Sequence, residues 1–344
     1  MINYKFYFFS IMLLGLSVAC SSYSDTPTDE KDSSIVNPSP SPKIIFDTDM
    51  GPDYDDVGAI TVLHALAAQG ECEILATLSS CAHPSISPTI EAFNTYFGHP
   101  DIPVGSPADN APNFTAKNGW NDTIIKNFLP EVKTNADYPS AVEVYRKTLA
   151  SQPDGSVTIV TVGFISNLAE LLKSTADEYS ELNGMELVKQ KVKHWVAMAG
   201  TIPQGREFNV YKHAEASYEV FRDWPTPVLL SGFEIGVKIK TGRKVAEQGS
   251  ATSPVQWAYN YNLQTYIKKE EDNRSSWDQT AVLVAVRNPE KYFYVNGPGK
   301  IKVDSEGSNE WDADESGKYF FLVHKYPYQH IADIIDDLMM YEPK

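Results

Sequence analysis

The chain has 344 residues, of which 42% are hydrophobic and 22% are charged, so it is too apolar for a disordered protein and long enough to bury a sizeable core. Its formal net charge of -16 argues against a nucleic-acid partner, because binding to the phosphate backbone needs a basic surface. Three cysteines are too few for a disulfide scaffold or for a Cys-rich zinc or iron–sulfur module.

Residues 1–20 resemble the signal sequence of bacterial lipoproteins. Lys5 precedes an apolar run over residues 6–19, which is shorter than the roughly 20 residues of a membrane span. Cys20 then stands where such proteins carry their lipid, so the resemblance implies a lipid anchor in a bacterial cell envelope, at the periplasmic face or the cell surface. An ordinary cleaved signal with an incidental cysteine is the alternative. The polar, proline-containing residues 21–42 cannot form a core and are predicted to be a flexible tether.

From residue 43 to residue 344 we predict one α/β domain with an open, mostly parallel sheet flanked by helices, because short apolar runs alternate with helical patterns. The predicted strands lie at 43–47, 73–79, 102–105, 157–162, 192–198, 227–230, 292–295 and 319–323. The predicted helices lie at 55–68, 88–97, 141–150, 166–174, 255–268, 278–286 and 328–339. The first helix should place Ile60, Leu63 and Ala67 on one buried face, and Ser166 or Asn167 should cap the helix that begins there. Residues 106–137, rich in Asn, Pro and Asp, are expected to form a long surface loop.

An acidic loop follows the first predicted strand, where open parallel sheets bind their ligands. It reads FDTDMGPDYDD and places aspartates at positions 47, 49, 53, 55 and 56. These carboxylates would repel one another, and a calcium ion, which takes oxygen ligands, would relieve that repulsion. The alternative is a solvated turn in which Asp55 or Asp56 caps the following helix. The spacing of an EF-hand is absent.

The segment DTDMGPDYDDVGA resembles the N-terminal signature Asp-x-Asp-x-Gly-x-Asp-Asp-x-x-Ala of the inosine–uridine-preferring nucleoside N-ribohydrolase family. The resemblance implies that Asp49 is a calcium ligand and the general base. It implies further that Asp55 contacts a ribose hydroxyl and that Asp56 is a second calcium ligand. This chain has two extra residues before its final Asp-Asp pair. Asp53 falls in this insertion, and whether it competes for the ion is open.

Three later segments, VTIVTVGFISNL, MAGTIPQGREFNVYKHAEAS and SSWDQTAVL, resemble the same family in the same order. They imply that the backbone carbonyl of Val162 and the carboxylate of Asp278 complete the calcium site. They also imply that Glu207 and Asn209 bind ribose hydroxyls. His83, in EILATLSSCAH, stands where the family has a sugar-binding asparagine.

Trp277 is the main departure from the family pattern. Purine-active members carry a histidine there that protonates the leaving base, whereas an indole N–H is no acid near neutral pH, although its ring can stack on a base. Three tyrosines on the preceding predicted helix either line the base pocket or only pack the helix: Tyr259, Tyr261 and Tyr266. His213 matches a helix-start position and is predicted to be structural.

The resemblance therefore implies a calcium-dependent enzyme that hydrolyses the N-glycosidic bond of a ribonucleoside or a related N-riboside and releases base and ribose. Two alternatives stay open. One is a ribose- or nucleoside-binding lipoprotein with little or no turnover, and the other is a hydrolase of a different glycoside whose leaving group is already activated. The expected partners are a small-molecule substrate and the membrane that holds the lipid anchor. The sequence leaves the base and the oligomeric state open, a homo-oligomer included.

Overall fold

The computed structural model describes residues 41–51, 53–108, 110–266 and 273–343, which belong to the unit Pro40–Lys344. The predicted signal sequence with Cys20, and the tether up to residue 40, lie outside these residues. Within the described ranges, no helix combines the length and the apolar character that crossing a bilayer requires.

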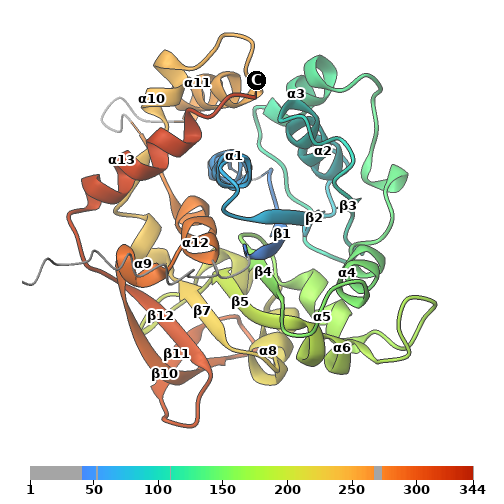
Figure 1. Cartoon of the computed structure of the whole chain (residues 1–344). Coiled ribbons are helices and arrows are strands. Elements are labelled where there is room, and N and C mark those ends of the chain that lie inside the picture. Colours follow the sequence, from blue (N-terminus) through green and yellow to red (C-terminus); the bar gives the residue numbers. More distant parts are fainter. Residues whose placement is uncertain (1–40, 52, 109, 267–272, 344) are drawn as a thin grey trace, which may run out of the picture. The chain divides into compact units, whose positions relative to one another are not determined.

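A ten-stranded sheet runs through the described residues in the order β3-β2-β1-β4-β5-β7-β12-β10-β11-β6 (Figure 1). Neighbours from β3 to β12 run parallel, and β10, β11 and β6 add antiparallel pairs at one side. The predicted open, mostly parallel α/β sheet is confirmed. Its strands are β1 (Lys43–Thr48), β2 (Glu73–Ser79), β3 (Val104–Gly105), β4 (Val157–Thr161), β5 (Val192–Met198), β6 (Gln204–Gly205), β7 (Val228–Ser231), β10 (Phe293–Val303), β11 (Asn309–Ala313) and β12 (Tyr319–His324). Separately, β8 (Lys240–Thr241) pairs with β9 (Arg274–Ser275).

Helices cover both faces of the sheet, which explains the continuous apolar run of β1. Ile44 and Phe46 lie in one hydrophobic cluster and Ile45 lies in the other, and all three are fully buried. A strand that is covered on both sides needs no polar alternation. The helices are α1 (Asp55–Ala68), α2 (Ile86–Tyr96), α3 (Trp120–Phe128), α4 (Ala141–Ala150), α5 (Ser166–Lys173), α6 (Gly184–Lys191), α7 (Phe208–Tyr211), α8 (Ala214–Asp223), α9 (Phe233–Gly236), α10 (Arg243–Gln248), α11 (Pro254–Tyr266), α12 (Trp277–Val286) and α13 (Tyr328–Met339).

Helix α1 has the predicted bounds but not the predicted single buried face. Every residue from Asp55 to Leu66 is buried, because α11, α12 and α13 pack against the helix in addition to the sheet (Figure 1). A helix that is enclosed in this way carries apolar residues all round rather than in one stripe.

Two further expectations were wrong. Residues 106–137 contain the helix α3, which begins after the left-handed Gly119 and buries Trp120 completely, and a short 3-10 turn at Asn135–Asp137. The residue that precedes α5 is Ile165, not Ser166 or Asn167. Asn167 instead donates from Nδ2 to the Asp47 carboxylate at 3.0 Å, so its side chain holds β1 rather than capping the helix.

Candidate active site

A cavity of about 630 Å³ lies beyond the carboxyl ends of β1, β4, β5 and β7, where open parallel sheets bind ligands. Each of these strands is followed by residues that line the cavity, and the start of α12 closes it. The lining residues are Asp49, Asp53, Asp55, Asp56, Val162, Met198, Thr201, Gly205, Arg206, Glu207, Phe208, Asn209, Tyr211, Phe233, Arg274, Trp277 and Asp278. Eight predicted site residues therefore meet in one cavity: Asp49, Asp55, Asp56, Val162, Glu207, Asn209, Trp277 and Asp278.

The acidic loop lies inside the molecule rather than in a solvated turn. Asp49, Asp55 and Asp56 are 5%, 1% and 2% exposed, respectively. Asp55 and Asp56 are the first two residues of α1, where the helix dipole favours negative charge, and Tyr54 precedes the helix without a side-chain cap. The alternative of a capping aspartate in a solvated turn therefore does not describe this loop.

The buried carboxylates disfavour one another's ionisation. Burial raises the pKa of Asp49 well above its usual value, and the charges of the neighbouring aspartates raise it further. The same two causes, in the same order, act on the pKa of Asp55 and of Asp278. Burial, followed by the charge of Asp53, raises the pKa of Asp56 to about 7, although the Thr48 hydroxyl donates a hydrogen bond to its carboxylate. A group of buried acids in this state favours either bound protons or a bound cation.

Asp53, which belongs to the two-residue insertion, is the exception among these acids. It forms an ion pair with Arg274, whose guanidinium lies 3.5 Å from Asp55 Oδ1 as well. Burial, the largest single effect, raises the pKa of Asp53, but the charge of Arg274 and the hydrogen bonds from Asp55 and Arg274 together outweigh burial and lower that pKa. The same guanidinium lies 5.4 Å from the centroid of the Tyr54 ring and 5.0 Å from that of Trp277.

The donor set fits a hard divalent cation. Asp49, Asp56 and Asp278 offer carboxylate oxygens and Val162 offers a carbonyl oxygen, and such cations prefer oxygen ligands. In the described chain, three acids have oxygen atoms that all lie within 4.8 Å of one another: Asp53, Asp55 and Asp56. The predicted ligands Asp49 and Asp278 face the same cavity but lie outside this tighter group.

Gly163 allows the loop after β4 to approach the acidic loop closely. A Cβ atom at this position would lie 2.4 Å from the Asp49 backbone nitrogen and 2.8 Å from the Asp49 Cβ. Such distances are far inside van der Waals contact, so any side chain here would displace Asp49 or Val162. The glycine thus brings the Val162 carbonyl and the Asp49 carboxylate to one cavity.

Glu207 and Asn209 form the wall that the sequence assigns to the sugar. Glu207 caps α7 by accepting hydrogen bonds from the backbone N–H groups of Asn209 at 2.9 Å and Val210 at 3.3 Å. Burial raises the pKa of Glu207 to about 7 despite these bonds. Asn209 donates from Nδ2 to the Val162 carbonyl at 3.0 Å, which fixes the side chain beside that carbonyl.

Trp277, the first residue of α12, also lines the cavity. Its indole Nε1 donates to the Phe233 carbonyl at 2.9 Å, and its ring stacks on the Phe233 ring with centroids 5.3 Å apart. The indole N–H is therefore already bonded to the protein, and what Trp277 presents to the cavity is an aromatic surface. None of the residues that line this cavity is a histidine.

Several predicted residues lie elsewhere. His83 is not among the lining residues; its Nδ1 lies 2.8 Å from Ser85 Oγ beside a separate small cavity. Tyr259 is fully buried and accepts a hydrogen bond from Gln279, and Tyr261 donates to the Asn118 carbonyl. Both tyrosines therefore hold α11, the helix to which they belong, against its neighbours. The side chain of Tyr266 lies outside the described residues. His213 precedes α8, and its Nδ1 lies 2.7 Å from Ser166 Oγ.

Sequence reasoning missed two cationic residues of the cavity, Arg206 and Arg274. Arg206 stands directly before the Glu207–Asn209 segment, and this adjacency was a usable signal. Arg274 reaches Asp53 across 221 positions of the chain, and no local pattern reveals such a contact.

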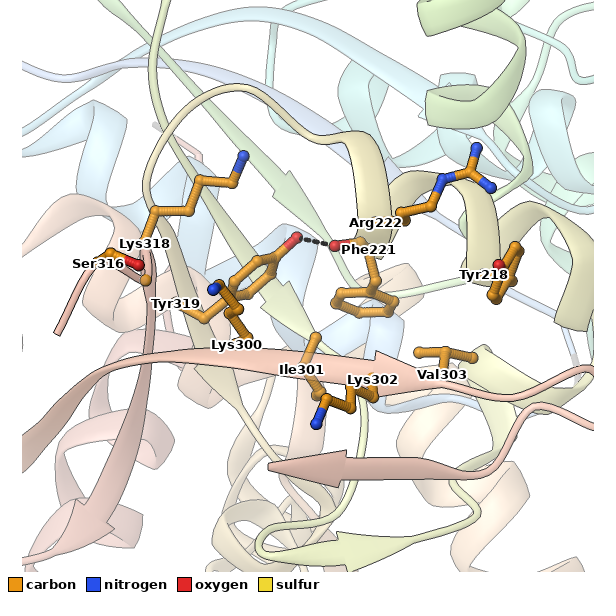
Figure 2. Close-up of a pocket in the computed structure, with 11 residues that line it drawn as sticks. Tyr218, Phe221, Arg222, Lys300, Ile301, Lys302, Val303, Ser316, Lys318 and Tyr319 are labelled. Carbon is orange, nitrogen blue, oxygen red and sulfur yellow. Dashed lines mark hydrogen bonds between the residues drawn. The ribbon is translucent and has the colours of Figure 1, made fainter. Parts of the chain in front are cut away.

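A second cavity, of about 400 Å³, lies between α8 and the strands β10 and β12 (Figure 2). The Tyr319 hydroxyl points across it and donates to the Phe221 carbonyl at 2.6 Å. Three of its cations are neutralised by acids: Arg222 by Asp223, Lys300 by Asp314, and Lys302 by Asp312. None of its lining residues carries a carboxylate, a histidine or a thiol, the usual side-chain ligands of a metal ion.

This architecture is similar to that of known proteins. The family model described as inosine-uridine preferring nucleoside hydrolase matches residues 44–330. Two similar solved structures are a plant nucleoside hydrolase, the PpNRh1 enzyme (TM-score 0.63, 18% identity, covering 88% of this chain and 99% of that chain), and a purine-preferring ribonucleoside hydrolase from Gardnerella vaginalis (TM-score 0.67, 18% identity, covering 86% and 98%). A third is the type III effector protein XopQ complexed with adenosine diphosphate ribose (TM-score 0.60, 14% identity, covering 89% and 94%).

A curated relative is also similar in sequence. It is an uncharacterized protein of Schizosaccharomyces pombe, 28% identical over 219 residues, which are 59% of this chain. The match spans 64% of the length of that relative.

Proposed function

The chain belongs to the inosine-uridine preferring nucleoside hydrolase family, and from this premise we propose that it is a calcium-dependent enzyme that hydrolyses the N-glycosidic bond of a ribonucleoside or a related N-riboside. One observation carries the proposal: four groups that can offer an oxygen atom to a cation face a single cavity at the carboxyl ends of the strands. They are Asp49, Asp56, Asp278 and the carbonyl of Val162.

Cleavage of an N-glycosidic bond passes through a transition state with oxocarbenium character, so the site must activate a water and stabilise positive charge on the sugar. Asp49 would accept the proton of the water, as the general base. Calcium, held by the four groups named above, would supply the positive charge that keeps the carboxylates ionised and acidifies the attacking water. The buried carboxylates around the sugar would in turn stabilise its developing positive charge.

Asp55, Glu207 and Asn209 would orient the ribose. Asp55 and Glu207 offer carboxylate oxygens to its hydroxyls, and Asn209 offers Oδ1, because its Nδ2 is already bonded to the Val162 carbonyl. Holding a substrate in the reactive geometry lowers a barrier by about 7–11 kcal/mol in favourable cases. Glu207 is fixed by the backbone N–H groups of α7, so this part of the site is formed before the substrate arrives.

The departing base would lie against Trp277 and Phe233, whose stacked rings offer a flat apolar surface. The lining of the cavity contains no imidazole to protonate the base, which favours a second candidate function. In that case the enzyme cleaves a riboside whose leaving group departs without a proton.

Ribose release from a panel of natural nucleosides and from p-nitrophenyl riboside, with purified protein and calcium, separates these functions. Release from natural nucleosides supports the proposed function. Release from p-nitrophenyl riboside alone supports the second candidate. No release from any of them, together with calorimetric binding of ribose, would instead favour a ribose-binding protein.

We also propose that Cys20 carries a lipid that anchors the protein in a bacterial envelope. The pattern of residues 1–20 and the polar residues that follow support this proposal. A Cys20→Ala variant, expressed with radiolabelled fatty acid, should lose the label and leave the membrane fraction. Equal labelling of the variant would contradict the proposal.

A further inference from the structure

Arg206 differs from every other arginine in its ion pairing. The chain holds 45 acidic residues against 29 lysines and arginines, and five of its six arginines pair with a carboxylate. These pairs are Arg146–Asp177, Arg222–Asp223, Arg243–Glu247, Arg274–Asp53 and Arg287–Glu71. Among the residues that the structure describes, Arg206 is the one arginine with no carboxylate at ion-pair distance.

The Arg206 side chain is nevertheless held in place. Its guanidinium carbon lies 4.1 Å from the centroid of the Tyr211 ring, and its Nε donates to the Glu306 carbonyl at 3.0 Å. Both Tyr211 and Arg206 line the substrate cavity. No described group accepts a hydrogen bond from either terminal Nη nitrogen, so two parallel donors of a fixed cation stay available at the edge of the cavity.

The C-terminal strands fix the backbone on which Arg206 stands. The strand β6, directly before Arg206, pairs with β11, and the Trp311 backbone N–H donates to the Pro203 carbonyl at 2.7 Å. Asn309, which is 3% exposed, accepts from the Thr201 N–H at 3.0 Å and donates to the Thr201 carbonyl at 2.8 Å. The antiparallel addition to the sheet thus orders one rim of the cavity before any ligand binds.

We propose that Arg206 binds a phosphate on the C5′ side of the substrate, so that the enzyme acts on a 5′-phosphorylated N-riboside, a nucleotide, in preference to the free nucleoside. This inference rests on the proposed function. A planar guanidinium with two free N–H donors matches phosphate oxygens in a bidentate geometry that lysine does not reproduce.

The position of Arg206 indicates which carbon of the ribose would carry the phosphate, namely C5′. The 2′- and 3′-hydroxyls belong at the acidic floor of the cavity, and the base at C1′ belongs against Trp277. C5′ is then the remaining carbon that carries a substituent, and we place it toward Arg206. Arg206 directly precedes Glu207 in the chain, is exposed, and lines the same cavity.

Steady-state kinetics on a matched pair of substrates, a nucleoside and its 5′-monophosphate with the same base, tests the assignment. We expect the unmodified enzyme to have the higher kcat/KM for the nucleotide. Arg206→Ala should lower that value about 10- to 100-fold and change the value for the nucleoside less than about threefold. Arg206→Lys should restore only part of the loss, because it keeps the charge without the planar pair of donors.

Arg222→Ala is the matched control, because it removes an arginine of the second cavity that is paired with Asp223 (Figure 2). It should leave both kcat/KM values unchanged. A higher kcat/KM for the nucleoside in the unmodified enzyme, or equal losses for both substrates in Arg206→Ala, would overturn the proposal.

Calorimetric binding of ribose and ribose 5-phosphate to the unmodified protein and to Arg206→Ala, with calcium present, keeps the test independent of turnover, because neither sugar has an N-glycosidic bond to cleave. Tighter binding of ribose 5-phosphate that disappears with Arg206→Ala supports the phosphate site even if no riboside is cleaved, in which case only the proposed function fails. Hydrolysis of nucleosides without any effect of phosphate overturns the phosphate site and leaves the proposed function intact. Binding of neither sugar overturns both.

Discussion

The carboxylate of Asp53, in the acidic loop before α1, forms an ion pair with the guanidinium of Arg274, shortly before α12. Asp53 lies in the insertion by which the acidic loop departs from the family signature, and Arg274 lies 5.0 Å from the ring of Trp277, the other departure. The two departures are therefore in contact through one cation. The pair also holds the guanidinium beside the Trp277 ring and turns Asp53 toward Arg274.

Replacing Asp53 by Asn tests whether this residue anchors Arg274 or binds the ion. Since Arg274 is largely buried, loss of its partner should lower the free energy of unfolding by about 1–2 kcal/mol, after allowance for its remaining exposure. Calcium affinity should change little. Asp312→Asn, which breaks the exposed pair with Lys302, is the control and should leave the stability within about 0.5 kcal/mol. A large loss of calcium affinity in Asp53→Asn would make Asp53 a ligand.

Asp49→Asn should abolish hydrolysis while the fold stays intact. The amide keeps the size of the side chain but cannot accept the proton of the attacking water, and removal of a general base typically costs about 10²–10⁴ in rate. Turnover measured by ribose release, with circular dichroism as the check on folding, decides this. Near-normal turnover would remove Asp49 from the mechanism.

Asp278→Ala should weaken calcium binding by more than about tenfold, because a charged oxygen ligand is lost from a site of few ligands. Isothermal titration calorimetry with calcium measures the affinity directly. Asp336, a half-buried acid that accepts a hydrogen bond from the Gly242 N–H, provides the control, since Asp336→Asn removes a carboxylate outside the cavity. Equal calcium affinities of Asp278→Ala and the unmodified protein would contradict the proposed site.

Gly163→Ala should impair both stability and activity. The new methyl group would lie 2.4 Å from the Asp49 backbone nitrogen, so the loop after β4 must move away from the acidic loop. Overpacking of this kind costs about 1–3 kcal/mol, and the movement would separate the Val162 carbonyl from Asp49. Urea denaturation and calcium titration measure the two effects. A variant with unchanged values in both would show that the close approach is unnecessary.

His64, which does not line the candidate active site, should make the free energy of unfolding fall in acid. Burial, and then the charge of His99, lower the pKa of His64 to about 3 from its ordinary 6.5. Among the described residues, no group forms a hydrogen bond with Nδ1, so a proton added there would find no acceptor. Because the unfolded chain binds this proton more readily, the contribution of His64 is complete above pH 6.5. It is lost as the pH falls from 6.5 toward 3, by at most about 1.4 kcal/mol per pH unit.

A His64→Gln variant checks this prediction. Glutamine keeps a polar group beside Asn94 but does not titrate. The free energy of unfolding, measured at several pH values between 7 and 5, should fall less steeply in the variant than in the unmodified protein. Parallel pH profiles would contradict the assignment.

The sequence predicted those parts of the fold that local patterns determine. The continuous apolar run of β1 and the bounds of α1 are as expected, because burial on both faces and helical spacing leave their mark on the residues themselves. Helix α3 was missed because its environment is rich in loop-forming residues. What supports it is tertiary: the burial of Trp120 and the hydrogen bonds from Asn121 to the Met50 carbonyl and to Thr89.

The candidate site divides in the same way. The resemblance selected Asp49, Asp56, Val162 and Asp278, which the fold gathers at one cavity, because each follows a strand or starts a helix at the same edge of the sheet. His83, also selected by alignment, is turned toward Ser85 instead. The contribution of the C-terminal strands to the cavity could not be predicted, because β6 and β11 pair across a separation of about a hundred residues and neither carries a pattern that names its partner.

A crystal structure of the protein with calcium and ribose tests the central claim most directly. The account predicts one calcium ion bound by carboxylate oxygens of Asp49, Asp56 and Asp278 and by the Val162 carbonyl, with the ribose between this ion and the wall of Glu207 and Asn209. A calcium ion bound elsewhere, or a sugar that occupies the cavity with no ion among these groups, would contradict it.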